Sequence, residues 1–256
     1  MTTALLSRRR VLVTGGGRGI GAAIVRALIV SGHEVTFTYR SAGAQADALI
    51  KELKEEFPDR PIAGRPLDLG DETAIEPFLA ELEADAPFSA LIHNAGQAYD
   101  SLAAVMDQIK ARAIMQVNFW SLTRLVGALV RPMTRARDGR IVVIGSIAAL
   151  RANQGNAAYA ASKAALLGYV RTLAIETARK GVTVNYVAPG FVETEMMERY
   201  AAQHAKMADQ IPTGRFAKPE EIAAVVAFLL SPLAGYITGA VLPIDGGLSA
   251  ALGIHR

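Results

Sequence analysis

A tyrosine and a lysine four positions apart have the spacing in this sequence that most directly suggests chemistry. Tyr159 and Lys163 fall in a segment with helical periodicity, 157–179, and residues four apart share one face of a helix. A phenol has an unperturbed pKa of about 10 and gives up its proton reluctantly near neutrality. A neighbouring ammonium favours the phenolate and lowers that pKa, so the pair suits proton transfer at a carbonyl oxygen. The same spacing arises by chance in many helices, so the interpretation needs support from other positions.

A serine thirteen positions before the tyrosine provides part of that support. Ser146 follows a β-branched run, 140–144, which is typical of a strand, and the end of that strand can direct the hydroxyl at the same carbonyl oxygen. Two O–H donors and a cation can stabilise an oxyanion, so we expect no metal. The four histidines show no ligand spacing, and the absence of cysteine excludes disulfides, thiolate catalysis and zinc–thiolate sites.

A glycine-rich segment near the N-terminus suggests a dinucleotide site. Thr14-Gly15-Gly16-Gly17-Arg18-Gly19-Ile20-Gly21 lies between a predicted strand, 11–14, and a helix that ends at Ser31-Gly32. Glycine permits positive φ and close approach of the backbone to a pyrophosphate, and the first helical turn presents free N–H groups to an anion. An ordinary tight turn would also use glycine, but the strand–loop–helix context favours the dinucleotide.

The end of the second predicted strand, 35–39, indicates which dinucleotide. NAD-binding folds usually place an acid there to bind the ribose 2′-hydroxyl, whereas this chain has Tyr39 followed by Arg40. A guanidinium can bind a 2′-phosphate through two hydrogen bonds, and Arg18 is a second cation within reach. We therefore expect NADPH/NADP+ as cofactor; the alternative is two surface arginines without a ligand.

The elements that must position these residues alternate between strands and helices. Further strands are expected at 62–67, 89–93, 182–187 and 240–244, and helices at 46–57, 72–83, 109–131 and 220–230. This alternation predicts an α/β fold, a Rossmann-type doubly wound parallel sheet of about seven strands with helices on both faces. We expect one domain, 1–256, with a cofactor-binding half at about 8–115 and a catalytic and substrate-binding half at about 116–256. A polar, methionine-bearing insertion at 191–216 is the expected substrate lid.

Composition excludes several other classes of protein. The 256 residues are 51% hydrophobic and 20% charged, with a net charge of only +3, so neither disorder nor nucleic-acid binding is expected. The cluster Arg8-Arg9-Arg10 is read as a solvated leader. No apolar run reaches the ~18–20 residues of a membrane span, and the first ten residues lack the pattern of a secretory signal. We therefore expect a cytoplasmic protein without membrane contact.

At this point the sequence resembles the short-chain dehydrogenase/reductase family, from Val11 to about Leu248. The glycine motif TGxxxGxG, Ser146 and the Tyr159/Lys163 pair carry the resemblance. It implies that Asn118, within Gln-Val-Asn-Phe-Trp, is a fourth catalytic residue that holds a water linked to the lysine, and that basic residues at the positions of Arg18 and Arg40 mark NADP preference. The resemblance also implies cofactor contacts by Asp68, Leu69, Asn94, Ala95, Gly96, Pro189, Gly190, Val192 and Thr194, in addition to Thr14, Gly15, Gly17, Gly19, Ile20, Gly21, Tyr159 and Lys163. Where the family usually has Asn-Asn-Ala-Gly, this chain has His93 first, and we expect a local change of hydrogen bonding with activity retained.

The resemblance is closest to the branch of 3-oxoacyl-[acyl-carrier-protein] reductases. That branch implies reduction of a 3-oxoacyl thioester, carried by acyl carrier protein or CoA, and assembly as a homotetramer or homodimer through the helices at 109–131 and 157–179. Arg137 and Lys180 match basic residues that dock the acidic carrier, although cations are also common at helix C-termini. Two alternatives remain: a dehydrogenase of sugars, polyols or other small alcohols, and a cofactor-binding scaffold without turnover.

Overall fold

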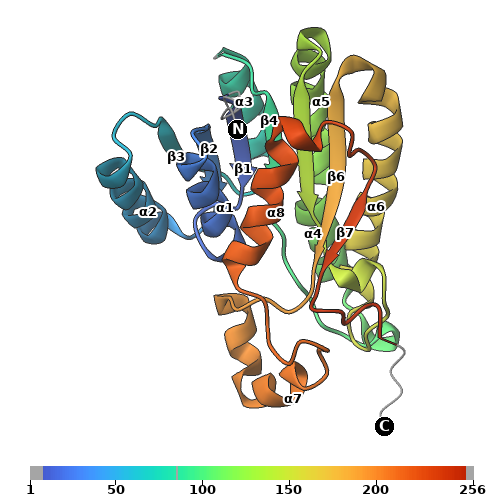
Figure 1. Ribbon diagram of the computed structural model, residues 1–256. Helices are drawn as coiled ribbons and strands as arrows, with labels where there is room; N and C mark the ends of the chain where they lie inside the picture. The colour runs from blue at the N-terminus through green and yellow to red at the C-terminus, as the bar shows by residue number, and fades with distance from the viewer. Residues whose placement is uncertain (1–7, 85, 252–256) are drawn as a thin grey trace.

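Seven parallel strands form one sheet in the order β3-β2-β1-β4-β5-β6-β7 (Figure 1). The computed structural model describes residues 8–84 and 86–251, so residues 1–7, residue 85 and residues 252–256 lie outside the described residues. The prediction of a seven-stranded, doubly wound parallel sheet is confirmed. The strands are β1 (Arg10–Thr14), β2 (Glu34–Tyr39), β3 (Ile62–Pro66), β4 (Ala90–His93), β5 (Gly139–Ile144), β6 (Val182–Pro189) and β7 (Val241–Ile244).

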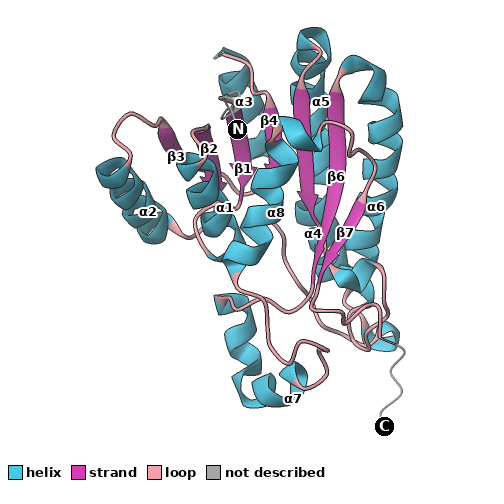
Figure 2. Ribbon diagram, viewed as in Figure 1, coloured by secondary structure: helices cyan, strands magenta, loops and turns pink. Residues whose placement is uncertain are grey.

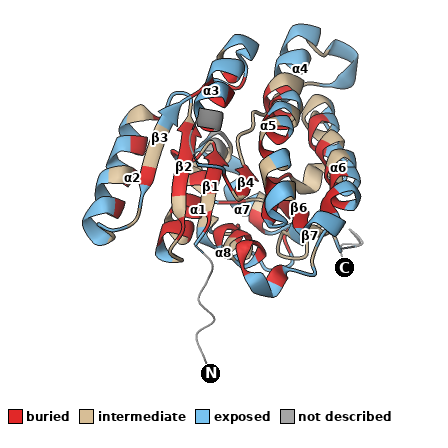
Figure 3. Ribbon diagram, turned by 90° about the horizontal axis from the view of Figure 1, so that it is seen from above, coloured by how far each residue is buried: buried red, intermediate tan, exposed pale blue. Residues whose placement is uncertain are grey.

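Helices cover both faces of this sheet (Figure 2). They are α1 (Gly19–Val30), α2 (Gly43–Glu56), α3 (Glu72–Ala84), α4 (Gln108–Met115), α5 (Ser121–Ala136), α6 (Ala157–Thr177), α7 (His204–Ala208) and α8 (Pro219–Leu230). Side chains of α1, α2 and α8 form one apolar cluster with the strands, and those of α3, α5 and α6 form the other. Buried residues accordingly concentrate in the strands and on the helix sides that face them (Figure 3).

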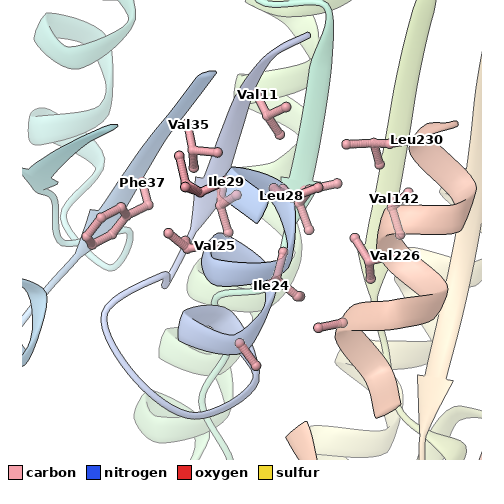
Figure 4. Packing of buried hydrophobic residues seen from close by; sticks show 14 of the residues in the cluster. Val11, Ile24, Val25, Leu28, Ile29, Val35, Phe37, Val142, Val226 and Leu230 are labelled. Atoms are coloured by element: carbon pink, nitrogen blue, oxygen red, sulfur yellow. The ribbon is translucent and has the colours of Figure 1, made fainter. Parts of the chain in front are cut away.

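The first cluster shows why the strands read as nearly continuous apolar runs. Val11 and Val142 of the sheet lie with Ile24 of α1 and Val226 of α8 in one group of buried side chains (Figure 4). A parallel sheet buried on both faces needs apolar residues at successive positions, because each strand contributes to two cores. β5 is buried at all six of its positions. The core therefore holds the C-terminal ends of the strands rigidly in place.

The expectation of a solvated basic leader at residues 8–10 is met only by Arg8, which is exposed, and is wrong for Arg9 and Arg10. Arg9 is only 3% exposed, and its guanidinium donates two hydrogen bonds to Asp138, at 2.8 and 3.0 Å, and one to the Leu230 carbonyl. Arg10 begins β1 and pairs with Glu34 at 2.8 Å. The sequence could not reveal this arrangement, because Asp138 lies 129 positions away and reaches Arg9 only after the sheet has assembled.

The long helix expected at 109–131 consists of three parts. A π-helical turn, Gln116–Trp120, separates α4 from α5, and the Ser121 hydroxyl donates to the Val117 carbonyl at 2.6 Å. The helix also continues past its predicted end through Pro132 to Ala136, at the cost of one backbone hydrogen bond. Together Gln108–Ala136 is long and apolar enough to span a membrane by length and composition, which corrects the expectation of no such stretch. Half of the most apolar 18-residue stretch of this segment is buried inside the fold, as in a core helix.

The order of the strands reverses beside β1, which lies between β2 and β4. At such a switch point the loops after the two central strands diverge to opposite faces of the sheet and leave a crevice at their C-terminal ends. Thr14 at the end of β1 is paired in register with His93 at the end of β4. The glycine loop and the Asn94-Ala95-Gly96 segment are thereby brought side by side, at the edge of the sheet where a ligand site is expected.

Candidate active site

A cavity of about 1060 Å³ opens at the C-terminal edge of the sheet. Three of the four predicted catalytic residues and all predicted cofactor contacts except Thr14 line it. Asn118 and Thr14 are fully buried behind its wall. The segment Glu195–Gln203, a 3-10 helix, and α7 cover one side of the cavity beyond the ends of the strands (Figure 1). Residues as far apart in sequence as Gly15 and Ala251 therefore share one chamber.

The glycine loop forms the floor of the cofactor end. Gly15 and Gly19 have φ values of +67° and +54°, which L side chains rarely adopt. A Cβ at Gly21 would overlap the Gly15 carbonyl oxygen, so only glycine allows the loop to fold back against α1. No side chain caps the N-terminus of α1, whose first N–H groups are therefore available to an anion. This geometry fits a pyrophosphate better than an ordinary turn.

The adenosine end of the cavity is basic where an NAD site would be acidic. Tyr39, the last residue of β2, and Arg40, the next, line the cavity, and no carboxylate occupies the end of that strand. Arg18 also lines the cavity, and its guanidinium forms an ion pair with Glu195 at 2.8 Å. Asp68 accepts a hydrogen bond from the Gly70 N–H at 2.8 Å, which fixes the turn after β3.

Ser146 is held at the end of β5 by a residue that the sequence analysis missed. The N–H of Ser146 donates to the Tyr186 hydroxyl at 3.0 Å, and a Cβ at Gly145 would overlap the Tyr186 ring. Tyr186 is fully buried on β6, and burial raises its pKa, so the phenol stays neutral. The Ser146 hydroxyl accepts from the Ala148 N–H at 3.1 Å, which leaves its hydrogen to donate into the cavity. The single aromatic residue within β6 was the available signal.

Tyr159 and Lys163 lie on adjacent turns of α6, as predicted. The ammonium nitrogen of Lys163 is 5.8 Å from the centre of the Tyr159 ring and donates to the Ile144 carbonyl at 3.0 Å. Lys163 is almost fully buried, and burial lowers its pKa to about 8. Anchoring by the end of β5 leaves two of its N–H groups to serve the phenol and a ligand in the cavity.

Asn118 lies in the π-helical turn rather than in the regular α-helix that was expected. Its side-chain amide donates to the Gln97 carbonyl at 3.0 Å and to the Ser162 hydroxyl at 2.8 Å, and its oxygen accepts from the Gln97 N–H at 2.8 Å. The Ser162 hydroxyl in turn donates to the Tyr159 carbonyl at 2.7 Å. Asn118 is therefore connected to the catalytic helix through Ser162, which the sequence analysis also missed because its hydroxyl is hidden in an alanine-rich helix. Single π-helical turns within α-helices are frequent at functional sites.

The two predicted docking cations lie far from this cavity. Arg137 ends α5 just before β5, and Lys180 precedes β6, so both lie at the N-terminal edge of the sheet. The six residues of β5 separate that edge from Ser146 by about 20 Å. Both side chains are exposed, and the Arg137 guanidinium donates to the Arg179 carbonyl at 3.1 Å. Within one chain the pair does not adjoin the reacting residues. Among the residues that the structure describes, no three His, Asp or Glu side chains are grouped so as to hold a metal ion.

Comparison with known proteins agrees with this geometry. A family described as enoyl-(acyl carrier protein) reductase matches residues 15–249. The chain is 41% identical to the 3-oxoacyl-[acyl-carrier-protein] reductase FabG of Escherichia coli K12, over 93% of this chain and 96% of that one. It is 37% identical to the 3-oxoacyl-[acyl-carrier-protein] reductase MabA of Mycobacterium bovis, over 94% and 92%. A solved short-chain dehydrogenase/reductase from Serratia marcescens superposes with a TM-score of 0.88 at 34% identity, over 96% and 99%. The chain belongs to the short-chain dehydrogenase/reductase family and is an oxidoreductase.

Proposed function

We propose that this protein reduces the ketone of a 3-oxoacyl thioester to the 3-hydroxyacyl thioester with NADPH. The observation that carries the proposal is the single cavity in which Ser146, Tyr159 and Lys163 adjoin the glycine loop. A proton donor and a dinucleotide site that share one chamber are what ketone reduction requires. The relatives are 37–41% identical to this chain over nearly its whole length, and their names support a 3-oxoacyl thioester as substrate.

The roles proposed for the residues follow from their hydrogen bonds. Tyr159 gives its phenol proton to the carbonyl oxygen as that oxygen gains charge. Ser146 donates its hydroxyl hydrogen to the same oxygen, since its acceptor side already binds the Ala148 N–H. Lys163 favours the phenolate left on Tyr159 and offers its remaining N–H groups to a cofactor ribose. Asn118 holds the water that links Lys163 to solvent. The hydrogen bond from the Asn118 side chain to the Ser162 hydroxyl keeps Asn118 itself in place.

NADPH supplies the hydride in such a reduction. The chain fits it because the Gly21 position admits no Cβ and the α1 N-terminus faces the cavity for the pyrophosphate. We infer that Arg40 and Arg18, which both line the cavity, bind the 2′-phosphate, with Arg18 exchanging its ion pair with Glu195 for the phosphate. Val192 and Thr194 follow β6 and line the same cavity, with Thr194 beside Gly19 of the glycine loop, and we propose that they bind the nicotinamide amide.

The docking of a carrier protein on Arg137 and Lys180 requires a second copy of the chain. A carrier bound at the N-terminal edge of one sheet cannot place its acyl group in the cavity at the other edge of the same sheet. Exposed apolar side chains on the predicted interface helices support a homotetramer or homodimer: Ile109 is 80% exposed, Trp120 51% and Ile175 81%. We place this assembly in the cytoplasm, the compartment of the biosynthetic thioesters.

A substrate panel tests the proposal. NADPH oxidation is measured with acetoacetyl-CoA, an acetoacetyl carrier protein, crotonyl-CoA, free ketones and, in reverse with NADP+, polyols. We expect the acetoacetyl thioesters to give the highest kcat/KM. A preference for crotonyl-CoA would instead assign the carbon–carbon double-bond reduction that the description of the matching family names. A preference for polyols would assign a small-alcohol dehydrogenase, and NADPH binding without turnover would assign a scaffold.

The same panel tests the docking surface. The double variant Arg137→Ala/Lys180→Ala should raise KM for the acetoacetyl carrier protein and leave KM for acetoacetyl-CoA unchanged, because only the carrier presents an acidic surface. The exposed pair Lys54→Ala/Arg65→Ala, one lysine and one arginine outside the cavity, is a matched control for the loss of two charges. An equal rise of KM for both thioesters would contradict the docking role.

A further inference from the structure

His93 is a buried histidine between the cofactor loop and the catalytic residues. It ends β4, its side chain is 0% exposed, and it stands where the family usually has asparagine. Its Nδ1 lies 3.2 Å from the Thr14 hydroxyl and its Nε2 lies 3.2 Å from the carbonyl oxygen of Asn118. One ring therefore touches the residue that begins the glycine loop and the residue at the centre of the π-helical turn.

The partners of His93 determine where its proton lies. A carbonyl oxygen can only accept, so Nε2 carries the hydrogen and donates it to Asn118. The Thr14 hydroxyl accepts from the N–H groups of Asn94 and Ala95, both at 3.1 Å, and its own hydrogen is therefore available to Nδ1. The ring is neutral, since burial and the nearby Lys163 ammonium lower the pKa of His93 to about 3. Every hydrogen bond in this group then has one donor and one acceptor.

These bonds continue without a break to the catalytic helix. The Thr14 hydroxyl donates to His93, His93 donates to the Asn118 carbonyl, and the Asn118 side chain donates to Ser162. Ser162 donates to the Tyr159 carbonyl in the first turn of α6. Within the π-helical turn, the side chains of His93 and Ser121 donate hydrogen bonds to the backbone carbonyls of Asn118 and Val117, respectively.

We propose that His93 is a positioning residue: its Nε2–H holds the Asn118 turn against the cofactor loop, and so keeps Asn118 and, through Ser162, Tyr159 in reacting geometry. The inference rests on the proposed ketone reduction. Its physical basis is that a buried carbonyl left without a donor forces the turn to shift or to admit water. A displacement of about 1 Å near reacting groups can cost up to about a hundredfold in rate.

Two substitutions separate this role from simple packing. In His93→Gln the side-chain amide can reach the position of Nε2 and retain a donor to Asn118, whereas His93→Leu retains volume and removes the donor. We expect His93→Gln to keep kcat within about threefold of the unsubstituted chain and His93→Leu to lose about tenfold or more, with NADPH affinity unchanged in both. The solvent deuterium isotope effect on kcat should rise only in His93→Leu, because proton delivery becomes slower.

His33 provides the matched control. It is also buried, at 2% exposed, and also bonds a backbone group, the Arg9 N–H at 3.2 Å, but it lies at the opposite edge of the sheet. His33→Leu should lower the melting temperature without changing the isotope effect. If His93→Leu behaves in the same way, with kcat and the isotope effect of the unsubstituted chain, His93 is merely structural and the proposal is overturned.

A second measurement does not depend on the substrate. Amide hydrogen exchange at residues 116–121 should be faster in His93→Leu than in the unsubstituted chain or in His33→Leu. This result is expected even if the panel of thioesters shows no turnover, so failure of the proposed function and failure of the His93 role are distinguishable. Unchanged exchange across the turn would refute the role of His93 by itself.

Discussion

The Lys163 ammonium nitrogen lies 5.8 Å from the centre of the Tyr159 ring, while it donates a hydrogen bond to the last residue of β5, Ile144. One side chain thus joins the catalytic helix to the end of the sheet that also carries Ser146. The proton donor, its activating charge and the second donor are fixed relative to one another by secondary structure rather than by loops. Preorganised groups of this kind need no rearrangement as charge develops on the substrate.

Removal of the Tyr159 hydroxyl should abolish most turnover and spare the cofactor site. Tyr159→Phe keeps the ring but removes the proton donor, so kcat for acetoacetyl-CoA should fall about 10²- to 10⁴-fold. NADPH affinity, measured by fluorescence titration, should change little. Tyr169→Phe, on the same helix but outside the cavity, is the control and should retain full activity. An unchanged kcat in Tyr159→Phe would refute the catalytic assignment.

Reversal of charge at Arg40 should move cofactor preference toward NADH. An aspartate there would repel the 2′-phosphate of NADPH and accept hydrogen bonds from the 2′-hydroxyl of NADH. We expect kcat/KM for NADPH to fall about tenfold or more, as for loss of one charged hydrogen bond, with kcat/KM for NADH maintained or raised. Arg65→Asp on the neighbouring strand β3, which is exposed and outside the cavity, controls for net charge. Equal NADPH affinity in Arg40→Asp and the unsubstituted chain would count against the NADPH assignment.

The rate of ketone reduction should fall as pH rises through about 8. Burial disfavours the charged form of Lys163 and lowers its pKa from 10.5 to about 8, so the ammonium is present below that pH and lost above it. Reductive kcat/KM should therefore decline by about tenfold per pH unit on the alkaline side. Lys163→Arg stays protonated, so its alkaline decline should move to higher pH even though its kcat is lower. An alkaline limb at the same pH in both proteins would assign that limb to another group.

The buried ion pair of Arg9 and Asp138 should matter for stability and not for catalysis. Asp138→Asn leaves the Arg9 guanidinium, 3% exposed, without its charged partner. Because Asp138 is half exposed, we expect a loss of about 2 kcal/mol of unfolding free energy, below the range for a fully buried pair. Chemical denaturation measures this loss, and kcat should be unchanged. Glu52→Gln, which breaks the exposed pair with Arg26, should have little effect on stability.

Local patterns were sufficient to predict most of the cleft. The sequence TGxxxGxG requires a turn with positive φ whatever surrounds it, and the spacing of Tyr159 and Lys163 places both on one face of any helix. The ends of parallel strands meet at one edge, so Ser146 and the glycine loop had to be neighbours once the alternation of elements was recognised. The 3-10 helix at Glu195–Gln203 and the full length of α5 were not predictable in this way, since packing overrode the signals of polarity and of Pro132.

The sequence by itself therefore determined the elements, the order of the reacting residues and the absence of an acid at the end of β2. Only the tertiary structure decided the supports: Tyr186 behind Ser146, Ser162 behind Asn118, and His93 between the start of the glycine loop and the π-helical turn. It also decided that Arg9 is buried and that Arg137 and Lys180 lie at the edge opposite the cavity. The physical reason is the range of the interactions. Turn geometry and helix periodicity act over a few residues. A buried hydrogen bond of this kind joins groups that are distant in sequence and become neighbours only when the sheet and its helices have assembled.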